Sequence, residues 1–347
     1  MSTQVSDLVS QEPPLPTPNP TFPFRVKSFQ WEDLPAIAEI YNRFYAAVQR
    51  DDRMSAEELG QYYRSPEMHP DTDVWTIVNE QNEIVAALEM ERSSTGSVRN
   101  WGDGAVDPAY WDRGIGTFIV HHLESELRQR TQQRIDADQA VALELHALNT
   151  DSRTIKLLLD NGYEKVRSFY RMTIDLTPLG DIEPTQLPPG LELRPFQPEQ
   201  AQAVYEAHQE SFRDHWGFEP FPYNEWEHWV LKHPKADTAL WRIVWEGDQI
   251  ASIALNRPYG SEHPDWGWIG IVGTRRPWRK RGLASLLLRE SFRAFKERGY
   301  VRAELGVDAS SLTNAVAVYQ RAGMSVGSQR DAYTKMLHGE RKAVYGE

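Results

Sequence analysis

The chain has 347 residues, and its 38 lysines and arginines against 50 aspartates and glutamates give a formal net charge of −12. A field of this sign repels phosphate backbones and anionic lipids, so we expect neither nucleic acid nor a membrane as a partner. The absence of cysteine excludes disulfides, thiolate metal sites and covalent cysteine intermediates. No apolar run is long enough to span a membrane and no leader sequence is recognisable, which predicts a cytoplasmic protein.

Proline-rich stretches interrupt the chain at two places. Six prolines lie between Pro13 and Pro23, so residues 1–23 are expected to form a disordered tail. A second stretch, TPLGDIEPTQLPPG at residues 177–190, has neither helical nor strand periodicity and is predicted to be a linker. Two units follow from these breaks, residues 24–176 and residues 191–347. A length of about two typical domains agrees with this division.

The two units resemble each other. FRVKSFQWEDLPAIAEIYNRFY begins at Phe24 and LELRPFQPEQAQAVYEAHQESF begins at Leu191, which aligns Phe29 with Phe196. Further on, Gly114-Ile115-Gly116 aligns with Gly282-Leu283-Ala284, and apolar residues at helical spacing follow both triplets. The chain therefore looks like a duplicated unit.

Each half shows the same predicted order of elements. A strand and a helix open it, followed by a variable helical region and two strands, at 75–90 in the first half and 240–257 in the second. Next come a third strand, a turn into a long helix, a further strand at 140–147 or 302–307, a short helix and a final strand. This order predicts an α/β fold with a mixed sheet in each half.

The turn before the long helix of the second half has the features of an anion site. Residues 268–274 form a predicted buried strand, and the small residues Gly282 and Ala284 would let backbone N–H groups face outward at a helix N-terminus. The basic residues of this turn, in a chain that is acidic overall, are Arg275, Arg276, Arg279, Lys280 and Arg281. This pattern favours a pyrophosphate ligand. The alternative, in which Gly282 serves helix packing and the basic run is a solvated surface, stays open.

Known nucleotide motifs do not account for this turn. The dinucleotide fingerprint requires a third glycine that neither half supplies, and the nucleoside triphosphate loop is absent. The segment Arg279-Lys280-Arg281-Gly282-Leu283-Ala284 resembles instead the [RQ]-x-x-G-x-[GA] signature of the GNAT superfamily of N-acetyltransferases. The segment from Asn314 to Met324, with Tyr319 ahead of Gly323, is similar to the second motif of that family at the expected distance.

The resemblance implies two tandem GNAT-like acyl-CoA N-acyltransferase domains that use acetyl-CoA. Within the superfamily, the tandem arrangement and the segment Ser211-Phe212-Arg213-Asp214-His215-Trp216-Gly217 resemble mycothiol synthase-type proteins most. The positions that the family motifs match in this sequence, and which are therefore expected to bind the cofactor, are Val272, Gly273, Thr274, Arg279, Lys280, Arg281, Gly282, Leu283, Ala284, Ser285 and Asn314.

Acetyl transfer to an amine requires a neutral nucleophile, a polarised carbonyl and a donor for the departing thiolate. Since the chain has no cysteine, direct attack in a ternary complex is expected. The resemblance places the Tyr319 phenol beside the cofactor sulfur as the catalytic acid, although a tyrosine that only packs on its helix is the alternative. It also implies a main-chain N–H donor in the strand at residues 272–274.

The general base is left open. Related enzymes often carry a glutamate on the strand before the cofactor turn, and the position that aligns with it here is Trp268. The candidates that remain are Glu262, Asp265, Glu304 and His215, each of which has an ordinary structural alternative.

The first half keeps the glycines but loses the matching side chains. Trp111 stands at the [RQ] position, Arg153 replaces Asn314, and Leu158 stands where Tyr319 does. A leucine cannot donate a proton, so the first half is predicted to be non-catalytic and to wall the acceptor site between the domains. The alternative is that it serves only folding or dimerisation. No histidine pattern indicates a metal site, and none is expected.

The sequence thus predicts an acetyl-CoA-dependent N-acetyltransferase whose acceptor is the primary amine of a small molecule. An acidic protein favours a cationic acceptor such as an amino sugar, a polyamine or an amino acid derivative. A non-catalytic CoA-binding regulatory protein and a protein N-acetyltransferase with an open groove are the alternatives. The oligomeric state is left open between a monomer and a homodimer.

Overall fold

The computed structural model describes residues 23–50, 52–66, 68–91, 98–260, 263–311 and 314–342. Residues 1–22, which carry most of the predicted tail, and Glu262 lie outside these ranges. The first half contains β1 (Arg25–Ser28), α1 (Leu34–Ala47), α2 (Ala56–Tyr63), α3 (Pro70–Asp73), β2 (Val74–Val78), β3 (Ile84–Glu91), β4 (Arg99–Val106), α4 (Ile115–Asp136), β5 (Val141–Leu148), α5 (Ser152–Asp160) and β6 (Glu164–Asp175). The second half contains β7 (Leu191–Arg194), α6 (Ala201–Phe212), α7 (Tyr223–Trp226), β8 (Arg242–Glu246), β9 (Gln249–Pro258), β10 (Trp266–Thr274), α8 (Leu283–Glu297), β11 (Arg302–Asp308), α9 (Ala315–Arg321) and β12 (Ser325–His338).

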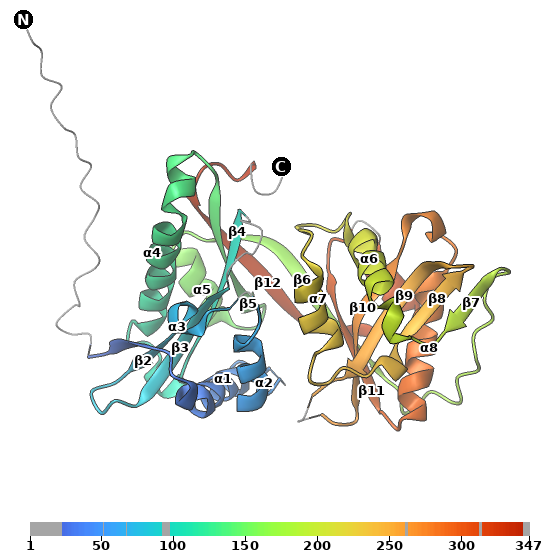
Figure 1. Cartoon of the computed structure of the whole chain (residues 1–347). Helices are drawn as coiled ribbons and strands as arrows, with labels where there is room; N and C mark the ends of the chain where they lie inside the picture. Colours follow the sequence, from blue (N-terminus) through green and yellow to red (C-terminus); the bar gives the residue numbers. More distant parts are fainter. Residues whose placement is uncertain are drawn as a thin grey trace, which may run out of the picture.

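The repeated order of elements and the α/β class are confirmed, and each half has three layers (Figure 1). In the first half, α1 and α2 pack on one face of the sheet around Ile37 and Ala87, and α4 and α5 pack on the other around Leu123 and Leu143. The second half repeats the arrangement, with α6 and α7 on one face and α8 and α9 on the other. Strands buried on both faces explain their nearly continuous apolar sequences. Within the described residues, no helix combines the length and the apolar character that a membrane crossing requires.

The twelve strands of the described residues belong to one sheet, in the order β1-β2-β3-β4-β5-β12-β6-β11-β10-β9-β8-β7. The last strand of each half lies beside the sheet of the other half: β6 pairs with β11, and β12 pairs with β5. In Figure 1 the red strand β12 and the green strand β6 run side by side between the two lobes. Residues 24–176 and 191–347 therefore describe repeated sequence units, while the sheets that they build exchange a strand.

Ion pairs reinforce this exchange. Lys165 of β6 contacts Asp331 of β12 at 2.7 Å, and the guanidinium of Arg167 donates two hydrogen bonds, of 2.9 and 2.8 Å, to Asp308 of β11. Separating the halves would break both strand pairings and these contacts together.

The stretch predicted as a linker is held along α8. The amide of Thr185 donates to Glu290 at 2.7 Å, and Leu179 and Ile182 pack on the core that contains Phe292. Because it is anchored at several points, this stretch fixes the path of the chain between β6 and β7.

Candidate active site

The site of the second half begins where two parallel strands separate. β10 and β11 pair only from Trp266 to Trp268, the last rung joining Trp268 to Glu304. Beyond that rung, β10 follows β9 as far as Thr274, whereas β11 follows β6. The separation leaves the side of β10 that faces β11 without a strand partner, so main-chain groups there are available to a ligand. A register shift between Ile269 and Ile271 marks the point of divergence.

The turn that follows β10 has a backbone that favours glycine. Gly282 caps α8 in the left-handed region, with φ 78° and ψ 6°. The amide of Leu286 donates to the Gly282 carbonyl at 3.1 Å, which is the first hydrogen bond of α8. The amides before Leu286 therefore have no carbonyl of the helix as an acceptor. A Cβ at position 282 would meet no atom within 4 Å, so there is open space beside the turn. The geometry suits an anion at a helix N-terminus.

A groove of about 560 Å³, here called the second-half groove, gathers most of the predicted cofactor residues in one place. Those that line it are Val272, Gly273, Thr274, Arg279, Lys280, Gly282, Leu283, Ala284 and Ser285, together with Tyr319. Arg281 and Asn314 are not among the lining residues. Arg281 pairs with Glu246 at 3.3 Å, and Asn314 caps α9 with φ 55°.

Most of the basic run is neutralised by acidic partners. The ion pairs join Arg275 to Glu210, Arg276 and Arg279 to Asp214, and Arg281 to Glu246. Arg279 also donates to the carbonyl of Ser211 at 3.1 Å and so ties β10 to the end of α6. Lys280, with φ 62°, has no ion-pair partner among the described residues and lines the groove. Since the charged lining residues are Arg279, Lys280 and Arg321, the groove carries positive charge with no carboxylate.

Tyr319 lies on α9 and is 8% exposed. Burial raises the pKa of its phenol to about 12, so the hydroxyl stays protonated at neutral pH and can donate a hydrogen bond. Leu158, at the matching place on α5, lines a similar groove of about 500 Å³ in the first half, here called the first-half groove. Tyr319 and Leu158 therefore each line a groove from the short helix of their half.

Glu304 is the base candidate that the structure brings into a cavity between the halves. This junction cavity, of about 590 Å³, is lined from both halves by residues that include Arg50, Arg330, Trp268 and Glu304. Glu304 is 2% exposed, and burial raises the pKa of its carboxyl above the ordinary value. One oxygen lies 2.8 Å from Arg302, while Oε2 has no hydrogen-bond partner among the described residues.

The other candidates lie elsewhere. Asp265 is exposed just before β10, and its main-chain carbonyl accepts a hydrogen bond of 2.8 Å from the amide of Val301. His215 lines the second-half groove, where burial lowers its pKa.

In the first half, β4 and β5 separate as β10 and β11 do, but the glutamate of the last rung has different contacts. β4 and β5 pair only from Arg99 to Trp101, the last rung joining Trp101 to Glu144. The Trp101 indole donates to Glu144 at 3.0 Å, and His146 lies 3.2 Å from the same oxygen. Burial alone would raise the pKa of Glu144, but its contacts with His146, Arg99 and Trp101 lower it.

The first-half groove is also less suited to a diphosphate. Gly114 has the same left-handed backbone as Gly282, with φ 81°, but Asp112 stands where Lys280 does. Asp103, Asp112 and Asp160 line this groove, with Asp112 paired to Arg153 and Asp160 to Lys156, so the lining side chains offer a diphosphate no net positive charge.

The sequence analysis missed some lining residues of the second-half groove. Ser211, at the end of α6, approaches β10 so closely that a Cβ on Gly273 would lie 2.8 Å from its own Cβ. Arg321 lies two residues beyond Tyr319 on α9 and adds a positive charge to the groove. Arg321 could have been predicted, because it is a basic residue that closely follows Tyr319 in the sequence. The approach of Ser211 could not, because it depends on how α6 packs.

Comparisons with known proteins agree with this geometry. The sequence profile described as Acetyltransferase (GNAT) family matches residues 34–149 and 201–324. A GCN5-related N-acetyltransferase from Sphaerobacter thermophilus is 28% identical, with a TM-score of 0.76 over 93% of this chain and 98% of that one.

Two further structures share the fold at lower identity. A tandem GNAT protein from the clavulanic acid biosynthesis pathway is 15% identical, with a TM-score of 0.69 over 91% of this chain and 99% of that one. A putative acetyltransferase from Pyrococcus horikoshii is 14% identical, with a TM-score of 0.55 over 93% of each chain. A search of curated protein sequences gives no match.

Proposed function

The chain belongs to the Acetyltransferase (GNAT) family, and from that premise we propose that its second half transfers an acetyl group from acetyl-CoA to the primary amine of a small molecule by direct attack in a ternary complex. Members of this family take their acyl group from acyl-CoA. One observation carries the proposal: the Tyr319 phenol and the open amides of the Gly282 turn line a single groove whose charged residues are all basic. A cytoplasmic location and the narrower likeness to mycothiol synthase-type proteins are parts of the same proposal.

The residues present fit a CoA thioester. The amides from Leu283 to Ser285 have open space before them, and Lys280 offers a positive charge that no side chain of the described protein neutralises. We assign the diphosphate to these groups. When bound, the thioester supplies an activated acyl carbon. The unpaired side of β10 near Val272 then offers main-chain N–H donors to the carbonyl oxygen.

Tyr319 and Glu304 would have separate roles, at the departing sulfur and at the attacking amine. A phenol of pKa about 12 is a weaker acid than a thiol of pKa about 8.5, so Tyr319 stabilises the departing sulfur by donating a hydrogen bond rather than by giving up its proton completely. Glu304 would take a proton from the attacking amine in the junction cavity through Oε2, which accepts no hydrogen bond from the described residues and lies 3.9 Å from Arg171. The amine is thus placed between the halves.

Release of free thiol tests the proposal directly. The chain has no cysteine, so a thiol-reactive chromogen reports only on CoA. The full chain with acetyl-CoA and a panel of amino sugars, polyamines and amino acid derivatives should release thiol with at least one acceptor. Tyr319→Phe should lower kcat about 10- to 100-fold and leave the Kd for CoA within about twofold. Tyr300→Phe is the matched control, because Tyr300 packs on Phe295 away from the groove.

Two results would overturn the proposal. The first is calorimetry that shows CoA binding while no amine accepts the acetyl group, because the protein would then bind CoA without catalysing transfer. Equal loss of activity in the Tyr319 and Tyr300 variants would remove the phenol from the mechanism.

A further inference from the structure

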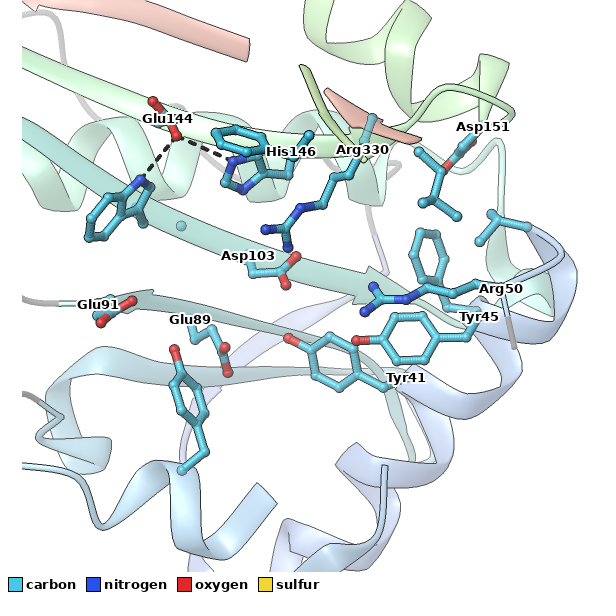
Figure 2. Close-up of a pocket in the computed structure, with 18 of the residues that line it drawn as sticks. Tyr41, Tyr45, Arg50, Glu89, Glu91, Asp103, Glu144, His146, Asp151 and Arg330 are labelled. Atoms are coloured by element: carbon cyan, nitrogen blue, oxygen red, sulfur yellow. Dashed lines mark hydrogen bonds and ion pairs between the residues drawn. The ribbon is translucent and has the colours of Figure 1, made fainter. Parts of the chain in front are cut away.

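A separate cavity of about 440 Å³ lies in the first half, to which we assign no acyl transfer. This first-half cavity is enclosed by α1, by β3, β4 and β5, and by the end of β12 that crosses from the second half (Figure 2). It adjoins the first-half groove, with which it shares Phe44, Gly102, Asp103 and His146. The charged side chains that line it are Glu89, Glu91, Asp103, Glu144, Asp151, Arg50, Arg99 and Arg330.

Two of the five lining carboxyl groups lie opposite each other on neighbouring strands. Glu89 of β3 and Asp103 of β4 are directly opposite partners in the antiparallel ladder. Glu89 is 7% exposed and accepts a hydrogen bond of 2.6 Å from the Tyr63 hydroxyl. Burial raises the pKa of Glu89 to about 8, and the charge of Asp103 adds to the increase. Like charges opposite each other are unfavourable, so a cationic group between them would be stabilised.

Two of the three lining guanidinium groups reach the cavity from outside the strands β3, β4 and β5. Figure 2 shows Arg330 extending from β12 and Arg50 extending from the side of α1. Arg50 pairs with Asp52 and lies over the Tyr45 ring at 4.2 Å. No hydrogen bond or ion pair holds the Arg330 side chain within the described part of the protein. Burial lowers the pKa of Arg330 and the charge of Arg50 lowers it further, whereas the charge of Asp103 raises it. A further anionic group beside Arg330 and Arg50 would offset their repulsion.

A buried hydroxyl between these charges also lacks a partner. Tyr41 of α1 is buried, its Oη has no hydrogen-bond partner among the described residues, and Figure 2 shows the hydroxyl directed into the cavity. A buried polar atom left unpaired costs free energy, which a ligand that bonds to it would recover. Phe44 and Trp101 supply apolar surface between the polar groups.

We propose that the first-half cavity binds a small zwitterion of the amino acid type, with its ammonium group at Glu89 and Asp103 and its carboxylate at Arg330. Neither a simple amine nor a simple carboxylate would satisfy both sets of groups. The second half closes the site, because the Arg99 guanidinium donates to the Gly217 carbonyl at 2.5 Å and lies 4.7 Å from the Trp216 ring. The full chain is therefore needed to form it.

Calorimetry on the full chain tests the assignment without any measurement of activity. The probes are the standard free α-amino acids and ω-amino acids of two to six carbons. For every ligand that binds, its N-acetyl derivative, which lacks the ammonium group, and its carboxamide, which lacks the carboxylate, are the matched controls. At least one zwitterion should bind at least tenfold more tightly than both of its derivatives.

Two variants locate the ligand. Asp103→Asn and Arg330→Gln should each weaken binding of the zwitterion at least tenfold, and Arg330→Gln should abolish the preference over the carboxamide. Arg330 also lines the junction cavity, whereas Asp103 does not, so the Asp103 variant separates the two places. Arg341→Gln, which removes an exposed pair with Glu164, should leave the Kd unchanged. Both test residues are exposed to the cavity, and thermal unfolding checks that the variants are folded.

The assignment would be overturned if no zwitterion bound better than its derivatives. It would also be overturned if the Asp103 and Arg330 variants bound as tightly as the parent protein. Thiol release with acetyl-CoA is measured separately, so failure of this site leaves the proposed acetyl transfer untouched.

Discussion

The indole of Trp101 donates a hydrogen bond of 3.0 Å to Glu144 in the last rung that joins β4 to β5. The same rung of the second half joins Trp268 to Glu304, whose Oε2 lacks a hydrogen-bond partner among the described residues. The pKa of Glu144 is lowered and that of Glu304 is raised. The tryptophan therefore holds the glutamate in the first half, whereas in the second half Glu304 contacts Arg302 and Arg171 instead. We propose that Glu304 is the carboxylate that takes part in proton transfer.

Replacing the Glu304 carboxylate should remove general-base catalysis. We expect Glu304→Gln to lower kcat about 100-fold. In the parent protein the rate should rise with pH as Glu304 loses its proton, and this rise should be absent from the variant. The measurement is the pH profile of thiol release. Glu144→Gln is the matched control and should retain kcat within about twofold; equal losses in the two variants would contradict the assignment.

The Gly282 turn should be sensitive to a single added methyl group. Gly282→Ala places a side chain in the left-handed region, which costs roughly 1–2 kcal/mol of stability, and adds a Cβ to the turn that we propose binds the cofactor. Gly299→Ala has nearly the same strain, with φ 80° and open space, but lies at the far end of α8. Urea unfolding should show similar losses in the two variants, while calorimetry should show weaker CoA binding only for Gly282→Ala. Similar CoA affinities would argue against the cradle.

Glu89 should make the protein less stable as the pH rises. Its pKa of about 8 in the folded state lies above the ordinary value of 4.5, so the folded state binds more protons than the unfolded state between these values. Stability attributable to this group is therefore present below pH 4.5 and is lost as the pH rises through 8. The loss is on the order of a few kcal/mol. Urea midpoints from pH 5.5 to 9 should fall less steeply in Glu89→Gln, and parallel curves would refute the expectation.

The exchanged strands should make the halves interdependent. Residues 191–342 alone lack β6, which leaves the edge of β11 unpaired, and they carry β12 without either of its neighbours. We expect this fragment to aggregate or to form dimers on size-exclusion chromatography, because unpaired strand edges recruit other chains. Co-expression with residues 23–190 should yield a one-to-one complex. A stable monomeric fragment with the melting temperature of the full chain would contradict this.

Local patterns in the sequence determined the repeated α/β order, the glycine turn before α8 and the positions of Tyr319 and Leu158. These features depend on side-chain periodicity and on the left-handed backbone at Gly282, which act over a few residues. They could therefore be predicted without knowing how the chain folds back on itself.

Tertiary structure alone decided the strand exchange, the partners of the basic run and the different states of Glu144 and Glu304. The strand β12 pairs through main-chain hydrogen bonds that either neighbouring sheet could accept, so its sequence does not specify its partner. The ion pair between Arg276 and Asp214 joins residues on separate elements. It neutralises a positive charge that the sequence analysis counted toward the anion site. Charges and hydrogen bonds act through space, and the distances between their partners exist only once the chain is packed.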